Sequence, residues 1–262
     1  MIWNELVEII DSHQHFVLTS HVRPDADALG SELGLARILK QMGKEVRIAN
    51  ASPTPTRLAF MDSKGEISVL GQSITEAEIL QAQVHIIVDT SAWGQLGDMA
   101  RSFRKSTARK IVIDHHVSSD DLEALMFKDV LAEATGTLIF ELLQALEQPL
   151  VEEIAEPLFC AIATDTGWFR FPSTRQHTMQ VVGELIRVGV RPSAIYETLY
   201  EQFSPGRMKL AGRVLERIQV ECEGKLATTY VKFDDYAETG AEPADTEDLV
   251  NECLRIKGTK SR

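Results

Sequence analysis

The sequence predicts an α/β protein built on a mostly parallel sheet with helices on both faces. Four short apolar runs, rich in β-branched residues, have the length of buried strands: residues 16–21, 45–49, 84–89 and 110–114. Segments with helical periodicity lie between and after these runs. Near-continuous apolar strands that alternate with helices are typical of parallel sheets covered on both faces and joined by right-handed crossovers.

Each predicted helix has apolar residues three and four positions apart and ends at a glycine or a proline. The first helix ends before Gly43, the second before Pro149 and the third before Gly189. The apolar positions are Leu29, Leu33, Ala36 and Leu39 in the first, Leu138, Leu142, Leu143 and Leu146 in the second, and Met179, Val182, Leu185 and Ile186 in the third.

The last part of the chain predicts a smaller second unit. Helical patterns continue through PSAIYETLYEQF and RMKLAGRVLERI, and the run LATTYVKF at 226–233 then alternates like a strand. We assign residues 1–188 to a first domain, 189–206 to a linker helix and 207–262 to a second α/β unit. A unit of this size with one predicted strand is marginal for an independent core, so we expect this domain to be incomplete.

Composition indicates a folded protein, because 44% of the residues are hydrophobic and 25% are charged. No stretch approaches the roughly 18 uninterrupted apolar residues of a membrane span, and the first residues do not resemble a signal peptide. We therefore expect a cytoplasmic protein without a membrane partner. Three widely spaced cysteines, Cys160, Cys222 and Cys253, predict neither a disulfide framework nor a zinc knuckle.

The charge balance limits the partners that the protein can have. The formal net charge is -12, and much of the acidic excess lies in residues 221–248. An acidic protein repels a long polyanion unless a local patch reverses the sign. The sequence thus argues against a general nucleic-acid binder and against long duplex substrates.

Polar residues gather where the predicted strands end. The carboxyl ends of strands are where ligands bind in open α/β sheets. Considered alone, each of these residues has a simpler structural explanation, as a helix cap, a turn residue or a core histidine whose hydrogen bonds are made within the protein. Their convergence after three strands favours a shared site. The residues are His21, Asp25 and Asp27 after the first strand, Asp89 after the third, Asp114, His115 and His116 at the fourth, and Asp165 after the apolar run 157–164.

Carboxylates that lie together repel one another unless cations neutralise them, so this cluster predicts a metal centre. The number of oxygen and nitrogen ligands suits two divalent ions, which together activate a water and stabilise the attacking and leaving oxygens of a phosphoryl group. A mixture of imidazole and carboxylate favours Mn²⁺, with Mg²⁺, Co²⁺ or Zn²⁺ as substitutes.

Four ordered motifs resemble the DHH phosphoesterase family: HVRPDADALGSELGLARIL, VDTSAWGQLGD, IDHH and ATDTGWFRFPST. The resemblance spans roughly residues 10–254 and is greatest to the branch of nano-RNases and 3'-phosphoadenosine 5'-phosphate phosphatases. It implies an α/β catalytic domain followed by a substrate-binding domain, called DHHA1. Residues 207–262 resemble only the entry into that second domain, and the family's glycine-rich GGGH segment is absent from the sequence.

The resemblance also implies roles for the clustered residues. One ion would be held by His21, Asp25 and Asp89, and the other by Asp27, Asp89, His115 and Asp165. Asp89 would bridge the ions, His116 would contact the substrate phosphate and Asp114 would orient the histidines. Arg23 and Arg170 are candidate phosphate contacts because a guanidinium grips phosphate with two hydrogen bonds, although exposed ion pairs explain them equally well.

The activity implied by the resemblance is hydrolysis of very short oligonucleotides to mononucleotides, together with removal of the 3'-phosphate from 3'-phosphoadenosine 5'-phosphate. Short oligonucleotides and this nucleotide are thus the expected partners, and a homodimer is compatible with them. A manganese-dependent inorganic pyrophosphatase is one alternative. A non-catalytic, metal-loaded binding protein is another, because the second domain is expected to be incomplete.

Overall fold

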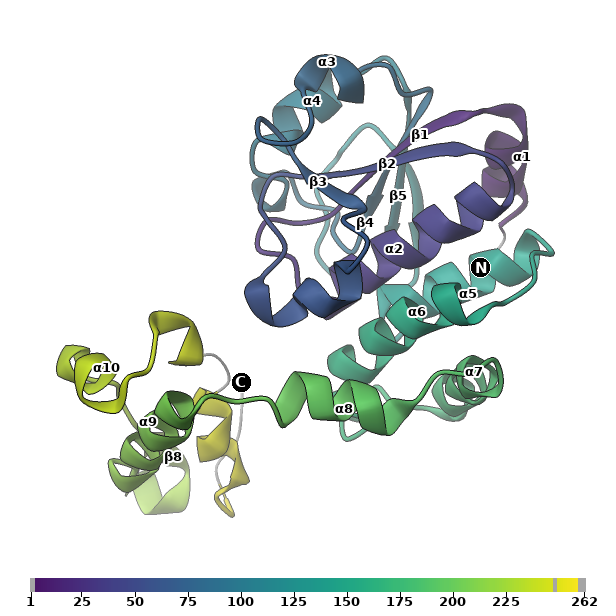
Figure 1. The fold of residues 1–262 in the computed structure, drawn as a ribbon. Helices are drawn as coiled ribbons and strands as arrows, with labels where there is room; N and C mark the ends of the chain where they lie inside the picture. Colours follow the sequence, from purple (N-terminus) through teal and green to yellow (C-terminus); the bar gives the residue numbers. More distant parts are fainter. Residues whose placement is uncertain (1–2, 247–248, 259–262) are drawn as a thin grey trace. The chain divides into compact units, whose positions relative to one another are not determined.

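The computed structural model describes residues 3–246 and 249–258. The chain forms two compact units, Met1–Ile195 and Tyr196–Arg262, and the division falls inside helix α8, Pro192–Tyr200 (Figure 1). No helix in the described part of the chain combines the length and the apolar character needed to cross a membrane.

The first unit is built on one six-stranded sheet in the order β3-β2-β1-β4-β5-β6, in which every neighbouring pair is parallel. The predicted α/β class and parallel sheet are confirmed. Two edge strands, β3 and β6, were not predicted, because runs of three and four residues are too short to show a period. The strands are β1 His15–Thr19, β2 Glu45–Asn50, β3 Ile67–Val69, β4 Val84–Val88, β5 Arg109–Asp114 and β6 Leu125–Lys128.

Helices cover both faces of this sheet (Figure 1). On one face, Met99 and Phe103 of α4 pack on buried strand residues such as Val17 and Val112. On the other face, α2 contacts β1, β2 and β4, and α5 contacts β5. With α2, α4 and α5 included, the helices of this unit that precede α8 are α1 Asn4–Ser12, α2 Ala26–Gln41, α3 Glu76–Ile79, α4 Met99–Lys105, α5 Thr135–Ala145, α6 Glu152–Asp165 and α7 Gln176–Arg187.

Glycines allow three of these helices to approach one another closely. A Cβ atom on Gly30 of α2 would lie 2.3 Å from the carbonyl oxygen of Pro157 in α6, and one on Gly34 would lie 2.5 Å from the Leu158 side chain. A Cβ atom on Gly136 of α5 would lie 2.6 Å from Cβ of Ala161. The apolar run 157–164 is therefore part of a buried helix, and Asp165 is the last residue of α6.

The second unit contains helix α9 Pro205–Glu216, an antiparallel pair of strands, β7 Gln219–Glu221 and β8 Leu226–Thr228, and helix α10 Phe233–Thr239. Its small core consists of Leu210, Val214, Ala241 and Leu249. The strand predicted over 226–233 was too long, because Asp235 accepts a hydrogen bond from the Lys232 amide and α10 begins at Phe233. The relation of this unit to a substrate-binding domain stays a prediction.

Candidate metal centre

The order of the strands brings the predicted site residues to one edge of the sheet. Strands β1, β4 and β5 are neighbours, and all three run in the same direction. His21 lies in the loop after β1, Asp89 directly follows β4, and Asp114 is the last residue of β5. The carboxyl ends of parallel strands meet at one edge, which is where open α/β sheets bind ligands.

His21, Asp25 and Asp89 form the first group of potential metal ligands, with one ligand atom of each within 4.8 Å of the others. The Nε2 atom of His21 lies 3.4 Å from Oδ2 of Asp89 and 3.8 Å from Oδ1 of Asp25. The Nδ1 atom of the same ring lies 3.0 Å from the carbonyl oxygen of Val22. A proton on Nδ1 is donated to that carbonyl, which leaves Nε2 available as a metal ligand.

Asp27, His115 and Asp165 form the second group. The Nε2 atom of His115 lies 3.7 Å from Oδ2 of Asp27 and 3.6 Å from both Oδ1 of Asp89 and Oδ2 of Asp165. The Nδ1 atom of His115 lies 3.2 Å from the Ala132 carbonyl oxygen. This ring is thus oriented in the same way as His21, with Nε2 facing the carboxylates.

Asp89 lies between the two groups, and each of its two carboxylate oxygens faces one of them. Oδ2 faces His21, whereas Oδ1 faces His115 and accepts a hydrogen bond of 2.9 Å from the Thr135 hydroxyl. The side chain is 2% exposed, and the residue has a φ of 62°. That left-handed conformation is uncommon outside glycine and holds the carboxylate at the end of β4.

The first turn of α5 supports Asp27. The backbone amides of Thr135 and Gly136 donate to its two oxygens at 2.7 and 2.9 Å, and the Ser31 hydroxyl lies 3.3 Å from Oδ1. The positive end of a helix dipole stabilises a carboxylate at this position. Thr135 was not among the predicted site residues, and its only signal in the sequence is a helix start at Gly136-Thr137.

Burial and mutual repulsion make three of the carboxylates, Asp27, Asp89 and Asp165, poor acids. Burial, and then the charge of Asp27, raise the pKa of Asp89 well above its usual value. Burial also raises the pKa of Asp27, and burial together with the charge of Asp27 raises the pKa of Asp165 to about 7. Groups that hold protons so tightly when no cation is bound exchange them for a divalent ion, so this donor set fits a metal centre.

In His21, hydrogen bonds outweigh the effect of burial on the pKa. Its burial disfavours the charged ring, but hydrogen bonds with Asp25 and Asp89 outweigh burial and raise the pKa of His21 to about 11. The imidazolium thus takes the place of a cation between these two carboxylates. A metal ion bound there would displace that proton, because an imidazole ligand must be neutral.

His116 and Asp114 lie beside these groups. His116 is half exposed, and its Nδ1 atom lies 2.8 Å from Oδ1 of Asp114 and 3.8 Å from Oδ1 of Asp89. Asp114 is fully buried, yet hydrogen bonds from His116 and Ser91 outweigh burial and hold its pKa below the usual range. The carboxylate of Asp114 in turn raises the pKa of His116 above its usual value.

The two predicted phosphate contacts are exposed. Arg23 lies in the loop between β1 and α2 with a φ of 53°. The Arg170 Nε atom donates to the Gly167 carbonyl at 2.7 Å, and its guanidinium lies 6.0 Å from the centre of the Phe171 ring. Their contact with a substrate stays a prediction.

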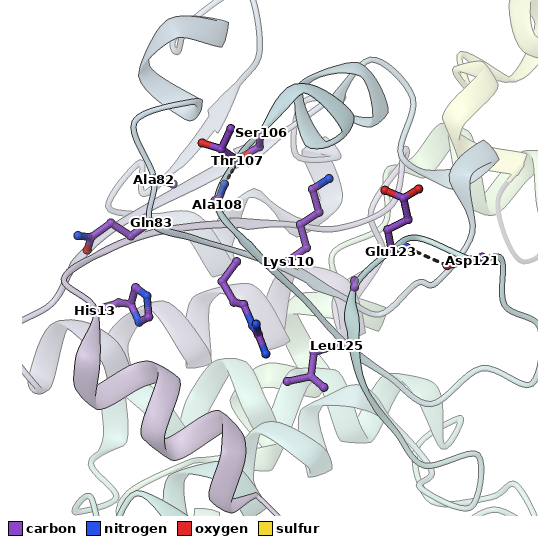
Figure 2. Close-up of a pocket in the computed structure, with 12 residues that line it drawn as sticks. His13, Ala82, Gln83, Ser106, Thr107, Ala108, Lys110, Asp121, Glu123 and Leu125 are labelled. Carbon is purple, nitrogen blue, oxygen red and sulfur yellow. Dashed lines mark hydrogen bonds between the residues drawn. The ribbon is translucent and has the colours of Figure 1, made fainter.

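A shallow pocket of about 1110 Å³ lies at the opposite edge of the sheet, and none of the predicted site residues lines it (Figure 2). Gln83 precedes β4, Lys110 lies near the start of β5, and Leu125 begins β6, so the pocket is at the amino ends of the strands. Its lining mixes charges of both signs, such as Lys110 and Glu123 (Figure 2). The clustered histidines and carboxylates therefore lie outside this pocket, at the carboxyl ends of the strands.

Comparison with known proteins gives matches over most of the chain. The profile of the DHH family's N-terminal domain matches residues 15–162. The bifunctional oligoribonuclease and PAP phosphatase NrnA of Bacillus subtilis is 30% identical over 261 residues, which are 98% of this chain and 79% of that protein. The protein of the same name from Thermus thermophilus is 31% identical, over 92% of this chain and 69% of its own.

Solved structures give the same picture of the fold. An exopolyphosphatase-related protein from Bacteroides fragilis superposes with a TM-score of 0.93 at 27% identity, covering 97% of this chain and 76% of its own. A putative family II inorganic pyrophosphatase from Methanococcus jannaschii superposes with a TM-score of 0.57 at 21% identity, over 93% and 80% of the two chains. The second likeness concerns the fold alone.

Proposed function

Because the chain belongs to the DHH family, we propose that it is a metal-dependent phosphoesterase acting on small nucleotide substrates. Its reactions would be hydrolysis of very short oligonucleotides to mononucleotides and removal of the 3'-phosphate from 3'-phosphoadenosine 5'-phosphate. The names of the two NrnA relatives support these substrates. The observation that carries the proposal is the position of Asp89, whose two oxygens face two separate groups of ligands.

The two groups would hold two divalent ions. His21 and Asp25 would bind one ion, and Asp89 would be shared with the other. The remaining ligands of the second ion would be Asp27, His115 and Asp165. Bound ions supply activation of a water and stabilisation of negative charge on a phosphoryl group. The mixture of carboxylate and imidazole favours Mn²⁺ over Mg²⁺, with Co²⁺ and Zn²⁺ as substitutes.

The chain's own residues prepare this centre in two ways. Thr135 and Gly136 hold Asp27 and Asp89 in place before any ion binds, which reduces the reorganisation needed later. The ring Nδ1–H groups of His21 and His115 donate hydrogen bonds to the carbonyl oxygens of Val22 and Ala132, and these bonds set the histidine tautomers. The proposed ligand atoms therefore already face one another.

His116 is the proposed contact to the scissile phosphate. Asp114 accepts hydrogen bonds from both the backbone amide and Nδ1 of His116, which leaves Nε2 free for a substrate. The same carboxylate favours the imidazolium. A protonated Nε2 would donate to a phosphoryl oxygen and stabilise the charge that develops there. Arg23 and Arg170 are proposed as further phosphate contacts from the exposed loops.

The acidic character of the chain favours substrates with few phosphates. At a net charge of -12, long-range repulsion opposes a long polyanion more strongly than a dinucleotide. We therefore propose that activity falls as the oligonucleotide lengthens.

A side-by-side assay tests the proposal. Protein supplied with Mn²⁺ is offered a 5'-phosphorylated dinucleotide, a 24-mer, 3'-phosphoadenosine 5'-phosphate and inorganic pyrophosphate, with Asp89→Asn as the inactive control. We expect the largest kcat/KM values on the dinucleotide and on 3'-phosphoadenosine 5'-phosphate. A preference for pyrophosphate would identify a pyrophosphatase, and tight Mn²⁺ binding without hydrolysis of any substrate would identify a binding protein.

A further inference from the structure

Lys128, the last residue of β6, is enclosed next to the proposed site although its position in the sequence carries no motif. Its Nζ atom lies 2.8 Å from the Ser91 hydroxyl, 2.6 Å from the Ser118 carbonyl oxygen and 3.1 Å from Oδ2 of Asp114. The side chain is only 15% exposed. A lysine ammonium has three N–H donors, and here three acceptors surround it.

These contacts involve residues on both sides of His116 in the sequence, Asp114 before it and Ser118 after it. Asp114 binds the backbone amide and the Nδ1 atom of His116, and Ser118 lies two residues after it. The Ser91 hydroxyl donates to Oδ2 of Asp114 at 2.6 Å, so it joins the same network. Lys128 thereby connects the ends of β4, β5 and β6 around the loop that carries His116.

Lys128 also places a positive charge next to the buried carboxylate of Asp114. Asp114 is completely buried and lies close to a site rich in carboxylates, where an unpaired carboxylate is costly. The Lys128 ammonium lies 3.1 Å from Oδ2 of Asp114, and Nδ1 of His116 lies 2.8 Å from Oδ1 of the same carboxylate. Nε2 of His116 is therefore the ring nitrogen presented away from Asp114.

We propose that Lys128 is a positioning residue for His116. It fixes Asp114 and the Ser118 carbonyl, and thereby holds the His116 ring in the orientation that the reaction requires. This inference rests on the proposed phosphoesterase function and adds a residue to it. Lys128 itself does not act on the phosphate, because its three donors are occupied and the side chain is enclosed.

The test compares Lys128→Ala with wild type and with the control Lys110→Ala. Lys110 is a lysine of the neighbouring strand β5, but it lies at the amino end of the sheet, in the pocket of Figure 2. We expect Lys128→Ala to lower kcat on a dinucleotide by about 100-fold, the size of effect expected when a catalytic group is displaced by about 1 Å. KM and Mn²⁺ affinity should change little, and the control should behave like wild type.

Two further measurements separate positioning from a general structural role. Hydrogen exchange of the backbone amides at 115–121 should become faster in Lys128→Ala, because the Ser118 carbonyl and Asp114 each lose one of their partners and keep only those from Ser91 and His116. Methylammonium should restore both kcat and slow exchange by occupying the vacated space with a small ammonium. Tetramethylammonium, which has the same charge and no N–H donor, should restore neither. Lys128→Met keeps most of the side-chain volume and replaces the alanine variant if that variant does not fold.

The outcomes are distinct. Wild-type kcat or wild-type exchange in the Lys128 variants would overturn the inference, and so would a loss of Mn²⁺ affinity parallel to the loss of kcat. If the wild-type protein hydrolyses no phosphoester, the proposed function fails. In that case hydrogen exchange at 115–121, with and without methylammonium, still decides whether Lys128 holds the His116 loop.

Discussion

The Thr135 hydroxyl donates a hydrogen bond of 2.9 Å to Oδ1 of Asp89, although the two residues are 46 positions apart in the sequence. Thr135 begins helix α5, so the same residue binds Asp27 through its backbone and Asp89 through its side chain. The start of one helix thus holds together a carboxylate from the first turn of α2 and one from the end of β4.

Thr135→Val should weaken Mn²⁺ binding by about 10-fold to 100-fold, the range found for partners of metal ligands. Valine matches the shape of threonine but cannot donate to Asp89, and the backbone amide that binds Asp27 is unchanged. Thr135→Ser keeps the hydroxyl and should stay near the wild-type affinity. Titration calorimetry of the three proteins with Mn²⁺ checks the order, and equal affinities for valine and serine would contradict it.

Asp89→Asn should lower Mn²⁺ affinity and activity more than Asp27→Asn or Asp165→Asn. Asp89 is the carboxylate that faces both groups, so its loss affects two ions, whereas each of the others belongs to one group. The measurement is the number of bound Mn²⁺ ions per chain, together with kcat/KM. A larger loss for Asp27→Asn or Asp165→Asn would show that Asp89 does not bridge.

Chelation should abolish hydrolysis, and added Mn²⁺ should restore it more fully than Mg²⁺. The reason is the pair of imidazoles among the proposed ligands, since Mg²⁺ prefers oxygen ligands alone. Activity is measured in excess chelator and then with each ion in turn. Full activity in the chelator would exclude the two-metal assignment.

The metal-free protein should become less stable between pH 5 and pH 8. When the pKa of a carboxyl is higher in the folded protein than in the unfolded chain, the folded protein still holds the proton at pH values between the two pKa values, whereas the unfolded chain has released it. Stability therefore falls as pH rises from the lower pKa to the higher one. Asp165 has its pKa raised to about 7, and Asp27 and Asp89 are shifted in the same direction. The pKa of His21 is raised from its usual value of 6.5 to about 11, so His21 also makes stability fall as pH rises above 6.5.

Bound Mn²⁺ should reverse this dependence, because the ions replace the protons at these ligands and bind more tightly as pH rises. Thermal unfolding across this pH range, with and without Mn²⁺, is the measurement. Glu32 serves as the control. Burial raises its pKa to about 7, and the charge of His21 is only a minor influence on it. Because Glu32 lies outside the ligand groups, the effect of Glu32→Gln on the pH profile should depend far less on Mn²⁺ than the effects of the ligands do. Parallel profiles with and without the ion would contradict the assignment.

Gly30→Ala should destabilise the first unit by about 1–3 kcal/mol, the usual cost of overpacking. Its new Cβ would lie 2.3 Å from a backbone oxygen of α6, so α2 and α6 must separate, and Asp165 moves with α6. Gly183→Ala in α7 is the matched control, since nothing lies within 4 Å of its Cβ position. Denaturant unfolding compares the two variants, and an equally stable or stabilised Gly30→Ala would show that the contact is not tight.

Much of this architecture can be predicted from the sequence. The apolar runs at 16–21, 84–89 and 110–114 have a length and residue type that suit buried parallel strands, and β1, β4 and β5 occupy them. Parallel strands place their carboxyl ends at one edge, so the polar residues that follow them must lie near one another. Local pattern and a topological rule together are therefore enough to locate the candidate site.

Other features depend on contacts that leave no periodic signal. The order of the strands, the short edge strands β3 and β6, and the start of α10 are decided by pairing and packing. Thr135 and Lys128 reach the site from segments that read locally as a helix start and a strand end. Asp165, the last residue of α6, lies at the site because Gly30 and Gly34 let α6 pack closely against α2.

The sequence by itself thus determined which residue types stand after each strand, because strand period and chain order are local properties. The tertiary structure alone decided which side chains support them. A hydrogen bond from Thr135 to Asp89 or an ion pair between Lys128 and Asp114 joins residues whose separation is set by the packing of whole helices and strands. Such distances result from the sum of many burial and pairing energies, and no short window of sequence contains that sum.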